Sequence, residues 1–173
     1  MTKPPSSSTL EEATAQQKQS SATSRKKVLA IASGGGHWVQ LLRLRPAFSE
    51  CDVIFATTRE SYRGDVSPHR FVRVPDCNRW EKIKLLRSAL MITALILRER
   101  PDTIVTTGAA PGYFAIRIGK LLNKRTIWVD SIANAEELSM SGTKAGKHAD
   151  LWLTQWAHLE KPAGPKFAGN VLG

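Results

Sequence analysis

The sequence of 173 residues contains only two cysteines, Cys51 and Cys77. Neither lies in a C-x-x-C or Cys/His spacing, so we expect no zinc site and no disulfide, and predict reduced, buried thiols in a reducing cytosol. Residues 1–25 lack the apolar segment of a secretory signal peptide. No apolar run reaches the roughly 18 residues that a membrane-spanning helix requires. These absences predict a cytoplasmic protein without a spanning helix.

Acidic residues are too few to balance the basic ones. The chain has 25 Lys and Arg against 15 Asp and Glu, which gives a formal net charge of +10. Such an excess predicts an anionic partner, which can be nucleic acid, anionic lipid headgroups or a phosphorylated substrate. Nucleic acid has no support beyond the charge, because basic and aromatic residues do not interleave on a recognisable module. We therefore expect no nucleic-acid partner.

Large apolar side chains are nearly absent from the first 26 residues, which are rich in Ser, Thr, Gln, Ala and Lys. Such a segment cannot bury enough surface to offset the entropy lost on ordering. We predict a disordered, basic, polar tail over residues 1–26. Residues 27–173 have the length of one domain with its own core.

Short apolar runs alternate with helical patterns along this domain. Continuous apolar runs are typical of strands buried on both faces, and spacings of three and four indicate helices. The predicted helices are 38–48, 80–100 and 113–122, and the predicted strands are 28–32, 52–57, 70–74, 102–106, 125–130, 151–154 and 166–171. The alternation predicts an α/β fold, a Rossmann-like parallel sheet with helices on both faces.

A glycine-rich turn follows the first predicted strand and opens a helix. Glycines let backbone N–H groups approach an anion, and a helix N-terminus adds partial positive charge. The candidate phosphate-binding residues are Ser33, Gly34, Gly35 and Gly36. The dinucleotide fingerprint is not met, because Val39 stands at its third glycine. His37 can exchange protons near neutral pH, so it is a candidate catalytic residue, with a structural histidine as the alternative.

Two further segments follow predicted strands, where ligands gather in parallel α/β sheets. One can admit a ligand close to its backbone or be only a tight connection. Its candidate binding residues are Gly108, Pro111 and Gly112. The other contains Asp130, which can act as a base, hold a sugar hydroxyl or cap the next helix. Asp130 is the second candidate catalytic residue, and Ser131 beside it is a candidate binding residue.

The helix predicted over 80–100 has an apolar central stretch, Leu85–Leu97, with basic residues on both sides. These 13 residues span about 20 Å, which is too short to cross a bilayer core of about 30 Å. The helix can lie in the core, or it can form an apolar and basic surface in the interface of an anionic membrane. Its candidate membrane or partner contacts are Leu86, Arg87 and Leu90.

Four segments, by their order and spacing, resemble a known family. They are Ser33–His37, Thr107–Tyr113, Val129–Ser131 with Leu138–Gly142, and Thr154–Trp156 with Phe167–Asn170. Together they are similar to the membrane-recruiting subunit of the split UDP-N-acetylglucosamine transferase of lipid-linked oligosaccharide synthesis. They are equally similar to its bacterial counterparts in exopolysaccharide synthesis, the PssD-like proteins. More distantly, residues 27–173 resemble the N-terminal half of MurG, which has a comparable glycine–histidine loop.

The resemblance implies the acceptor-binding half of an inverting GT-B glycosyltransferase, inactive alone. It implies a catalytic partner that binds the donor, and transfer of GlcNAc or another hexose from a UDP-sugar to a lipid-diphosphate-linked acceptor. No metal or other cofactor is expected. Gly35, Gly36 and His37 would lie at the acceptor diphosphate and the reacting hydroxyl, and Asp130 at the place of an acidic residue that is usually Glu. Ser141 and Gly142 would belong to a loop near the partner.

The polar tail differs from the N-terminal membrane anchor of the eukaryotic subunit. Membrane attachment would then fall to the helix around Leu85–Leu97 or to the partner. We therefore expect a bacterial version that is cytoplasmic and peripheral on the inner face of the cell membrane. The alternative is a non-catalytic scaffold that only recruits a catalytic partner to the membrane.

Overall fold

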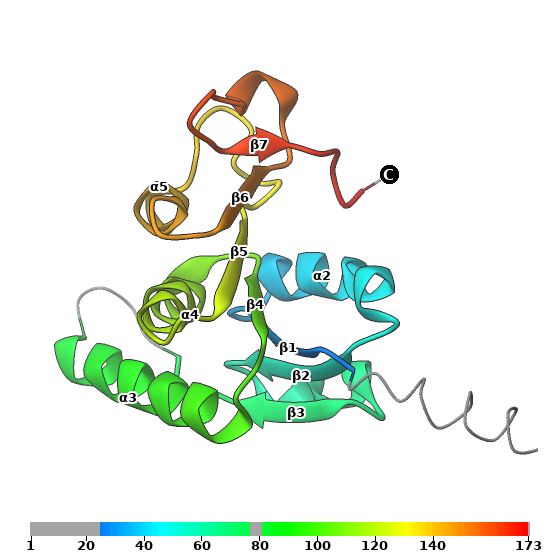
Figure 1. Cartoon of the computed structure of the whole chain (residues 1–173), viewed down its shortest axis with the longest axis vertical. Helices are drawn as coiled ribbons and strands as arrows, with labels where there is room; N and C mark the ends of the chain where they lie inside the picture. The colour runs from blue at the N-terminus through cyan, green and yellow to red at the C-terminus, as the bar shows by residue number, and fades with distance from the viewer. Residues whose placement is uncertain (1–24, 77–80, 173) are drawn as a thin grey trace, which may run out of the picture.

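The computed structural model describes residues 25–76 and 81–172, and in them one parallel sheet organises the chain (Figure 1). Its seven strands follow the order β3-β2-β1-β4-β5-β6-β7. The strands are β1 (Lys27–Ile31), β2 (Asp52–Thr57), β3 (Arg70–Arg73), β4 (Thr103–Thr106), β5 (Arg125–Val129), β6 (Leu151–Thr154) and β7 (Lys166–Phe167). The helices are α2 (Gly36–Arg43), α3 (Lys82–Glu99), α4 (Ala109–Leu121) and α5 (Met140–Gly146), with the 3-10 helices η1 (Arg45–Phe48), η2 (Glu60–Val66) and η3 (Ala157–Leu159).

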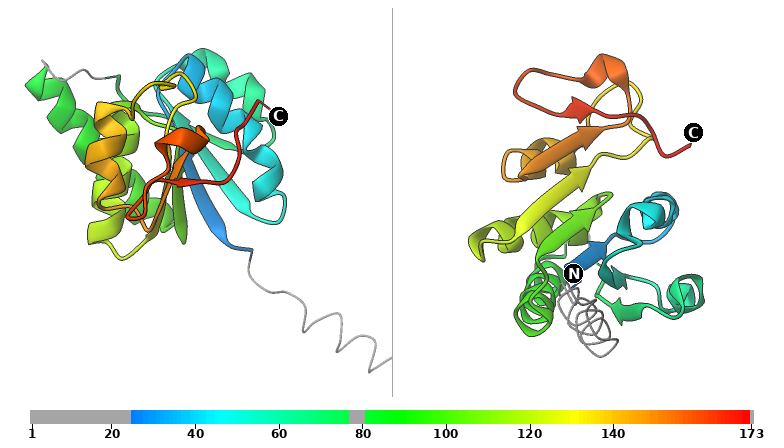
Figure 2. Two further views of the ribbon diagram at one scale, coloured as in Figure 1. Left: turned by 90° about the horizontal axis from the view of Figure 1, so that it is seen from above. Right: turned by 45° about the vertical axis from the view of Figure 1, so that its right-hand side comes forward.

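Helices cover both faces of the sheet. Helices α3, α4 and α5 lie on one face, and α2 with η1 and η2 lies on the other (Figures 1 and 2). Successive side chains of a strand point to opposite faces. Val28 and Ala30 of β1 therefore pack with Trp38 of α2, whereas Leu29 and Ile31 pack with α3. The predicted Rossmann-like fold, with helices on both faces of a parallel sheet, is confirmed.

The strand order reverses between β1 and β4. β1 pairs with β2 on one side and with β4 on the other. Helix α2 leaves β1 toward one face, and α4 leaves β4 toward the opposite face (Figure 2). In open parallel sheets, ligands bind outside the carboxyl ends of the strands at such a reversal. Both glycine-rich segments begin there.

Several element bounds differ from the sequence predictions. The segment 109–112, expected as a loop, is the first turn of α4, with Gly108 as its N-cap. The residues Ser139 to Gly142, which the resemblance placed in a loop, form the N-cap and first turn of α5, since the Ser139 hydroxyl caps this helix by accepting a hydrogen bond from the Gly142 N–H at 2.8 Å. The last predicted strand, 166–171, ends at Phe167, since Gly169 has a φ of 95°. The helix predicted over 38–48 ends at Arg43 and continues as the 3-10 helix η1.

The predicted tail falls outside the described residues, apart from residues 25 and 26, and so does Cys77. Cys51 is a free thiol that packs against the core on the α2 side. It is half-buried, whereas the sequence predicted a buried thiol. In the described part of the chain, no helix combines the length and hydropathy that crossing a membrane requires.

Asp150 joins the end of α4 to the start of two strands. Its Oδ2 accepts hydrogen bonds from the Thr126 backbone N–H at 2.9 Å and from the Thr126 hydroxyl at 3.0 Å, and its Oδ1 pairs with Lys120. The hydrogen bond from Lys120, followed by those from Thr126, lowers the pKa of Asp150 below its usual value. The carboxylate therefore stabilises the fold in its charged form.

We expect Asp150→Asn to lower the free energy of unfolding by about 1–2 kcal/mol near neutral pH, because hydrogen bonds to a charged group are lost. A carboxyl with a lowered folded-state pKa stabilises the fold above its ordinary pKa of about 3.9, and this contribution disappears as the pH falls through the lower value. Urea unfolding at neutral pH and near pH 2 measures the difference. Asp52→Asn, which removes only an exposed contact with Lys27, is the control, and a difference between Asp150→Asn and the unaltered chain that is equal at both pH values would contradict the ionic origin.

Candidate functional site

Side chains that follow β2 or belong to η2 hold the glycine turn after β1. The Gly34 N–H donates to the Thr58 hydroxyl and the Gly35 N–H to the Tyr62 hydroxyl, both at 3.2 Å. Gly35 has a φ of 70°, a conformation that favours glycine. Because these two N–H groups already have acceptors, Gly34 and Gly35 do not offer them to an anion as predicted. The first turn of α2, from Gly36 onward, has N–H groups without an acceptor inside the helix.

His37 connects this turn to the end of β4. Its Nδ1 lies 2.9 Å from the Thr107 carbonyl oxygen, and the Thr107 hydroxyl donates to the His37 carbonyl oxygen at 2.7 Å. A carbonyl only accepts, so Nδ1 carries the proton and the neutral ring has its lone pair on Nε2. His37 is half-exposed. The site thus contains an oriented imidazole with Nε2 as its basic atom.

Gly108 makes room for this ring. A Cβ at residue 108 would lie 2.8 Å from both Nδ1 and Cε1 of His37, and the residue has a φ of 131°. Gly112 permits a second close approach, because a Cβ there would lie 2.1 Å from Oγ1 of Thr106 on β4. Gly108, Pro111 and Gly112 are all buried. Their expected contact with a ligand stays a prediction, and Ala109 and Ala110 are the half-exposed residues of this turn.

Asp130 organises the loop that follows β5. Its side chain is 1% exposed. Its Oδ1 accepts hydrogen bonds from the Ser131 N–H at 3.1 Å, the Asn134 amide at 3.3 Å and the Ser139 hydroxyl at 2.6 Å, and its Oδ2 accepts the Ser139 N–H at 3.0 Å. A carboxylate with this burial and these partners positions residues 131–142. The catalytic role expected for Asp130 stays a prediction.

Gln40, on the inner side of α2, links the glycine turn to this loop. Its Nε2 donates to the Gly36 carbonyl at 3.1 Å and to the Ser131 hydroxyl at 3.0 Å. Its Oε1 accepts the Ile132 N–H at 2.9 Å. Sequence reasoning did not single out Gln40, although a polar residue between Val39 and Leu41 was a signal. Ser131 is 6% exposed and serves this network, so its expected contact with a ligand is also corrected.

Gln155 extends the same network to β6 and the C-terminal segment. Its Nε2 donates to Oε1 of Gln40 and to the Asp130 carbonyl, both at 2.8 Å. Its Oε1 accepts the Val171 N–H at 3.0 Å. Gln155 lay within a motif that carries the family resemblance, but it was not predicted as a site residue. Gln40 and Gln155 join the glycine turn to the loop after β5, and the contact between His37 and Thr107 adds the segment after β4. The three predicted segments therefore meet at the carboxyl ends of the strands.

Arg59 brings positive charge to the glycine turn. Its side chain lies on Gly34, since a Cβ at residue 34 would be 2.8 Å from the Arg59 Nε. Arg59 is exposed, and none of the ion pairs in residues 25–76 and 81–172 includes it. Within those same ranges, no three His, Cys, Asp or Glu side chains gather as a metal-binding group. Arg59 therefore adds a positive charge to the exposed part of the site, which runs from Ser33 to His37.

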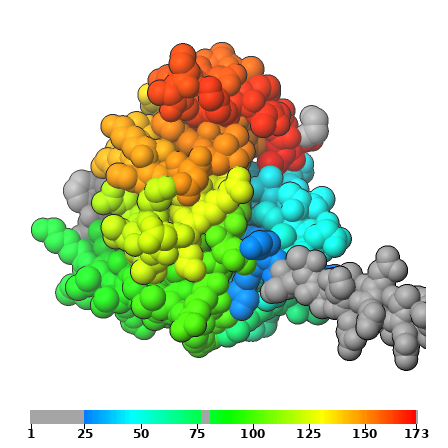
Figure 3. Space-filling model, viewed as in Figure 1, coloured from blue at the N-terminus to red at the C-terminus, as the bar shows by residue number. Residues whose placement is uncertain are grey.

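Helix α3 has one buried face and one exposed apolar face. Ile92 and Ile96 are buried in the core, whereas Leu86 and Leu90 are 62% and 61% exposed. Figure 3 shows α3 standing out at the surface beside α4. The sequence left a core helix and a membrane-interface surface as alternatives. One face of α3 does lie in the core, and the membrane contact of the exposed face stays a prediction.

Basic residues flank the exposed face of α3. A hollow of about 410 Å³ beside it is lined by Arg73, Lys84 and Arg87, together with Asp76 and three apolar residues. Glu81 raises the pKa of Lys84 through a hydrogen bond, so Lys84 stays cationic at neutral pH. Apolar and cationic side chains therefore share one surface.

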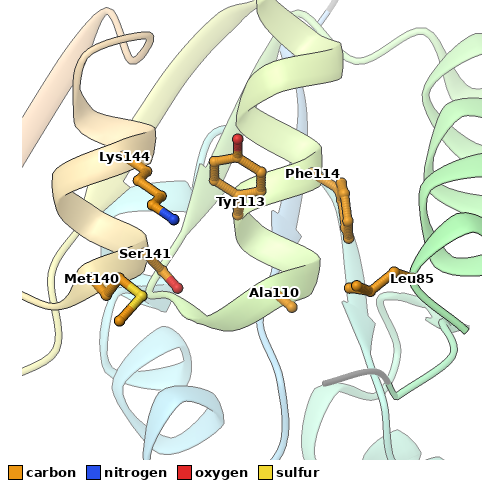
Figure 4. Close-up of a pocket in the computed structure, with 7 residues that line it drawn as sticks. All are labelled: Leu85, Ala110, Tyr113, Phe114, Met140, Ser141 and Lys144. Carbon is orange, nitrogen blue, oxygen red and sulfur yellow. The ribbon is translucent and has the colours of Figure 1, made fainter. Parts of the chain in front are cut away.

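The two expected partner contacts on α5 differ in exposure. Ser141 is half-exposed, but Gly142 is buried, and a Cβ there would lie 2.9 Å from the Asp130 carboxylate. The contact expected at Gly142 has no exposed surface and is corrected. Ser141 instead lines a separate pocket between α3, α4 and α5 (Figure 4).

No family model matches the chain. The chain is 28% identical to human UDP-N-acetylglucosamine transferase subunit ALG14, over 83% of this chain and 82% of that protein. The resemblance predicted from the motifs is confirmed: over most of its length the chain is similar to this subunit of a UDP-N-acetylglucosamine transferase.

Solved structures share the fold. MurG of Acinetobacter baumannii superposes with a TM-score of 0.69 at 12% identity, over 84% of this chain and 45% of MurG. UDP-N-acetylglucosamine 2-epimerase of Rickettsia bellii superposes with a TM-score of 0.61 at 15% identity, over 86% of this chain and 46% of the epimerase. The chain thus spans less than half of each. At these identities the likeness shows a common Rossmann-like fold.

We expect Gln40→Ala to lower the free energy of unfolding by about 2–3 kcal/mol, because the Ile132 N–H and the Gln155 amide lose buried partners. Urea denaturation monitored by tryptophan fluorescence measures the change. Val39→Ala, an exposed neighbour on the same helix, is the control and should change stability by less than about 0.5 kcal/mol. Equal effects of the two substitutions would contradict the role given to Gln40.

Proposed function

We propose that this chain is the acceptor-binding subunit of a two-component, inverting glycosyltransferase. The enzyme moves GlcNAc or another hexose from a UDP-sugar to a lipid-diphosphate-linked acceptor in oligosaccharide or polysaccharide biosynthesis. The observation that carries the proposal is the oriented His37 ring, whose Nδ1 contacts the Thr107 carbonyl oxygen at 2.9 Å. The similarity to a UDP-N-acetylglucosamine transferase subunit supports the same activity.

In this proposal, His37 is the general base. Its Nε2 takes the proton of the acceptor hydroxyl while the hydroxyl oxygen attacks the anomeric carbon of the donor sugar. The bond from that carbon to the diphosphate breaks, and UDP leaves with the electron pair. Asp130 keeps the loop 131–142 in place beside this reaction. The Thr107 carbonyl stabilises the imidazolium that forms, because Nδ1–H still donates to it.

The acceptor diphosphate binds at the first turn of α2. Gly36 and His37 bring N–H groups there without intrahelical acceptors, and Arg59 lies on Gly34 with its charge unpaired in the described part of the chain. A helix N-terminus and a guanidinium both favour phosphate oxygens. In this assignment Gly36 contacts the diphosphate through its backbone N–H. Ser33, Gly34 and Gly35 form the turn that holds Gly36 in place.

The donor site belongs to a second, catalytic subunit in this proposal. The word subunit in the name of the human relative supports a separate chain for the donor site. The half-exposed Ser141 is the proposed contact with that subunit. Without it, the chain binds the acceptor but transfers no sugar.

The exposed face of α3 is the proposed contact with the inner face of the cell membrane. Leu86 and Leu90 insert between lipids, and Arg87 with the basic hollow beside α3 attracts anionic headgroups. This places the protein as a peripheral, cytoplasmic subunit. The alternative function is a scaffold that recruits the catalytic subunit to the membrane without contributing to the chemistry.

We expect His37→Ala to reduce kcat of the reconstituted two-subunit enzyme by at least about a hundredfold, since the general base is lost. Steady-state transfer from a UDP-sugar to a lipid-diphosphate acceptor measures it. His69→Ala, which removes an exposed histidine near the opposite edge of the sheet, is the control. Unchanged turnover per complex with weaker assembly would favour the scaffold, and turnover by the isolated chain would contradict the two-component enzyme.

We expect the double substitution Leu86→Asp and Leu90→Asp to weaken binding to phosphatidylglycerol vesicles at least about tenfold, because apolar burial is replaced by charge repulsion. Vesicle sedimentation at low and high salt measures it. Leu121→Asp, an equally exposed leucine at the end of α4, is the control. Retained binding by the double variant would reject α3 as the membrane contact.

A further inference from the structure

A pocket of about 280 Å³ lies between α3, α4 and α5 (Figure 4). It is slightly smaller than sites that enclose a whole small ligand, which measure about 300–1,000 Å³. It therefore fits one part of a larger ligand. Its described lining residues are Leu85 from α3, Ala110, Tyr113 and Phe114 from α4, and Met140, Ser141 and Lys144 from α5.

The pocket and the His37 ring lie on opposite sides of the first turn of α4. Ala110 lines the pocket, and Gly108, two residues earlier, contacts the ring. Ala109 and Ala110 are half-exposed and carry the smallest side chains that α4 could offer at this point. A ligand held at His37 can therefore pass over this turn and reach the pocket.

The chemistry of the lining is apolar with one cation. Leu85, Tyr113 and Phe114 present hydrocarbon surface, and of the described residues that line the pocket Lys144 alone is charged. In Figure 4 the amine of Lys144 points toward Tyr113, across the pocket. None of the ion pairs in the described ranges includes Lys144. An apolar hollow beside an unpaired cation is complementary to a hydrocarbon that carries an anionic group.

We propose that this pocket binds the hydrocarbon segment nearest the diphosphate of the lipid acceptor, with Lys144 against the phosphate closest to the lipid. The inference rests on the proposed function and adds that the protein itself recognises the lipid. Leu85 lies in the pocket and Leu86 on the exposed face of α3. The remainder of the hydrocarbon therefore continues from the pocket along α3 into the membrane.

Three water-soluble probes test this on the full chain by isothermal titration calorimetry: inorganic diphosphate, isopentenyl diphosphate and geranyl diphosphate. Each buried methylene strengthens binding about fourfold. Geranyl diphosphate should therefore bind at least about tenfold more tightly than inorganic diphosphate, with the five-carbon probe between them. Equal affinities for the three probes would overturn the assignment.

Two substitutions in opposite walls locate the effect. Ala110→Leu fills the pocket from α4, and Leu85→Asn places an amide in the α3 wall. Each substitution should abolish the increase in affinity with the length of the probe's hydrocarbon. The affinity for inorganic diphosphate should stay within about twofold of that of the unaltered protein. Because there are two variants, the test does not depend on one of them folding. Ala47→Leu, at an exposed alanine of η1, is the control. A chain-length gain that survives both substitutions would overturn the proposal.

Lys144→Gln tests the cation. It should weaken the binding of all three probes by about the same factor, whereas Lys147→Gln, at an exposed lysine beyond the pocket, should change none of them. Unchanged diphosphate binding in Lys144→Gln would overturn the phosphate contact.

The proposed function and this inference fail in different ways. The reconstituted complex could transfer no sugar while the protein still binds probes with longer hydrocarbons more tightly. That result would reject the transferase and retain the pocket. A complex that transfers sugar with the same KM for short-chain and long-chain acceptors would retain the transferase and reject the pocket.

Discussion

The reciprocal contact between His37 and Thr107 is the interaction on which the site depends. It joins the turns that follow β1 and β4, two strands that are paired in the sheet. The same contact fixes the proton on Nδ1 and so leaves Nε2 as the basic atom. It is possible only because residue 108 has no Cβ to displace the ring. Orientation of the imidazole is thus a consequence of backbone geometry at the point where the sheet reverses its strand order.

A buried polar network holds this edge of the sheet at a fixed geometry. Gln40, Gln155 and Asp130 are each at most 6% exposed. Gln40 and Gln155 join α2, the loop after β5 and the C-terminal segment, and the Asp130 side chain holds that loop together. Buried polar groups are costly when unpaired, so such a network favours a single arrangement of its members. It includes the Asp130 carboxylate, whose hydrogen bonds hold the loop 131–142. Function in this protein is concentrated in the few residues that the network leaves at the surface.

The two faces of the sheet present different chemistry to a ligand. On the α2 side, the exposed groups are the glycine turn, the imidazole and Arg59. On the side of α3, α4 and α5, they are an apolar pocket, Lys144 and the apolar face of α3 (Figures 3 and 4). Between these two surfaces lies the first turn of α4, which presents only the small side chains of Ala109 and Ala110. A molecule with a sugar at one end, a diphosphate in the middle and a hydrocarbon at the other end matches this sequence of surfaces.

The sequence by itself determined the alternation of the strands with the helices α2, α3 and α4, the parallel Rossmann-like sheet, and the position of His37 after the first strand, because continuous apolar runs and glycine turns are local patterns. It also carried the resemblance to a transferase subunit. It did not predict α5. Only the tertiary structure decided which polar residues face a ligand. Gln40 meets Ser131 and Gln155, which are 91 and 115 residues away along the chain, and Asp130 is enclosed by a loop that α5 terminates. The sequence also could not decide whether one face of α3 is exposed. An apolar helix that is buried on one face and exposed on the other has the same composition as a fully buried helix. Burial and hydrogen-bond partners depend on segments that no local pattern contains.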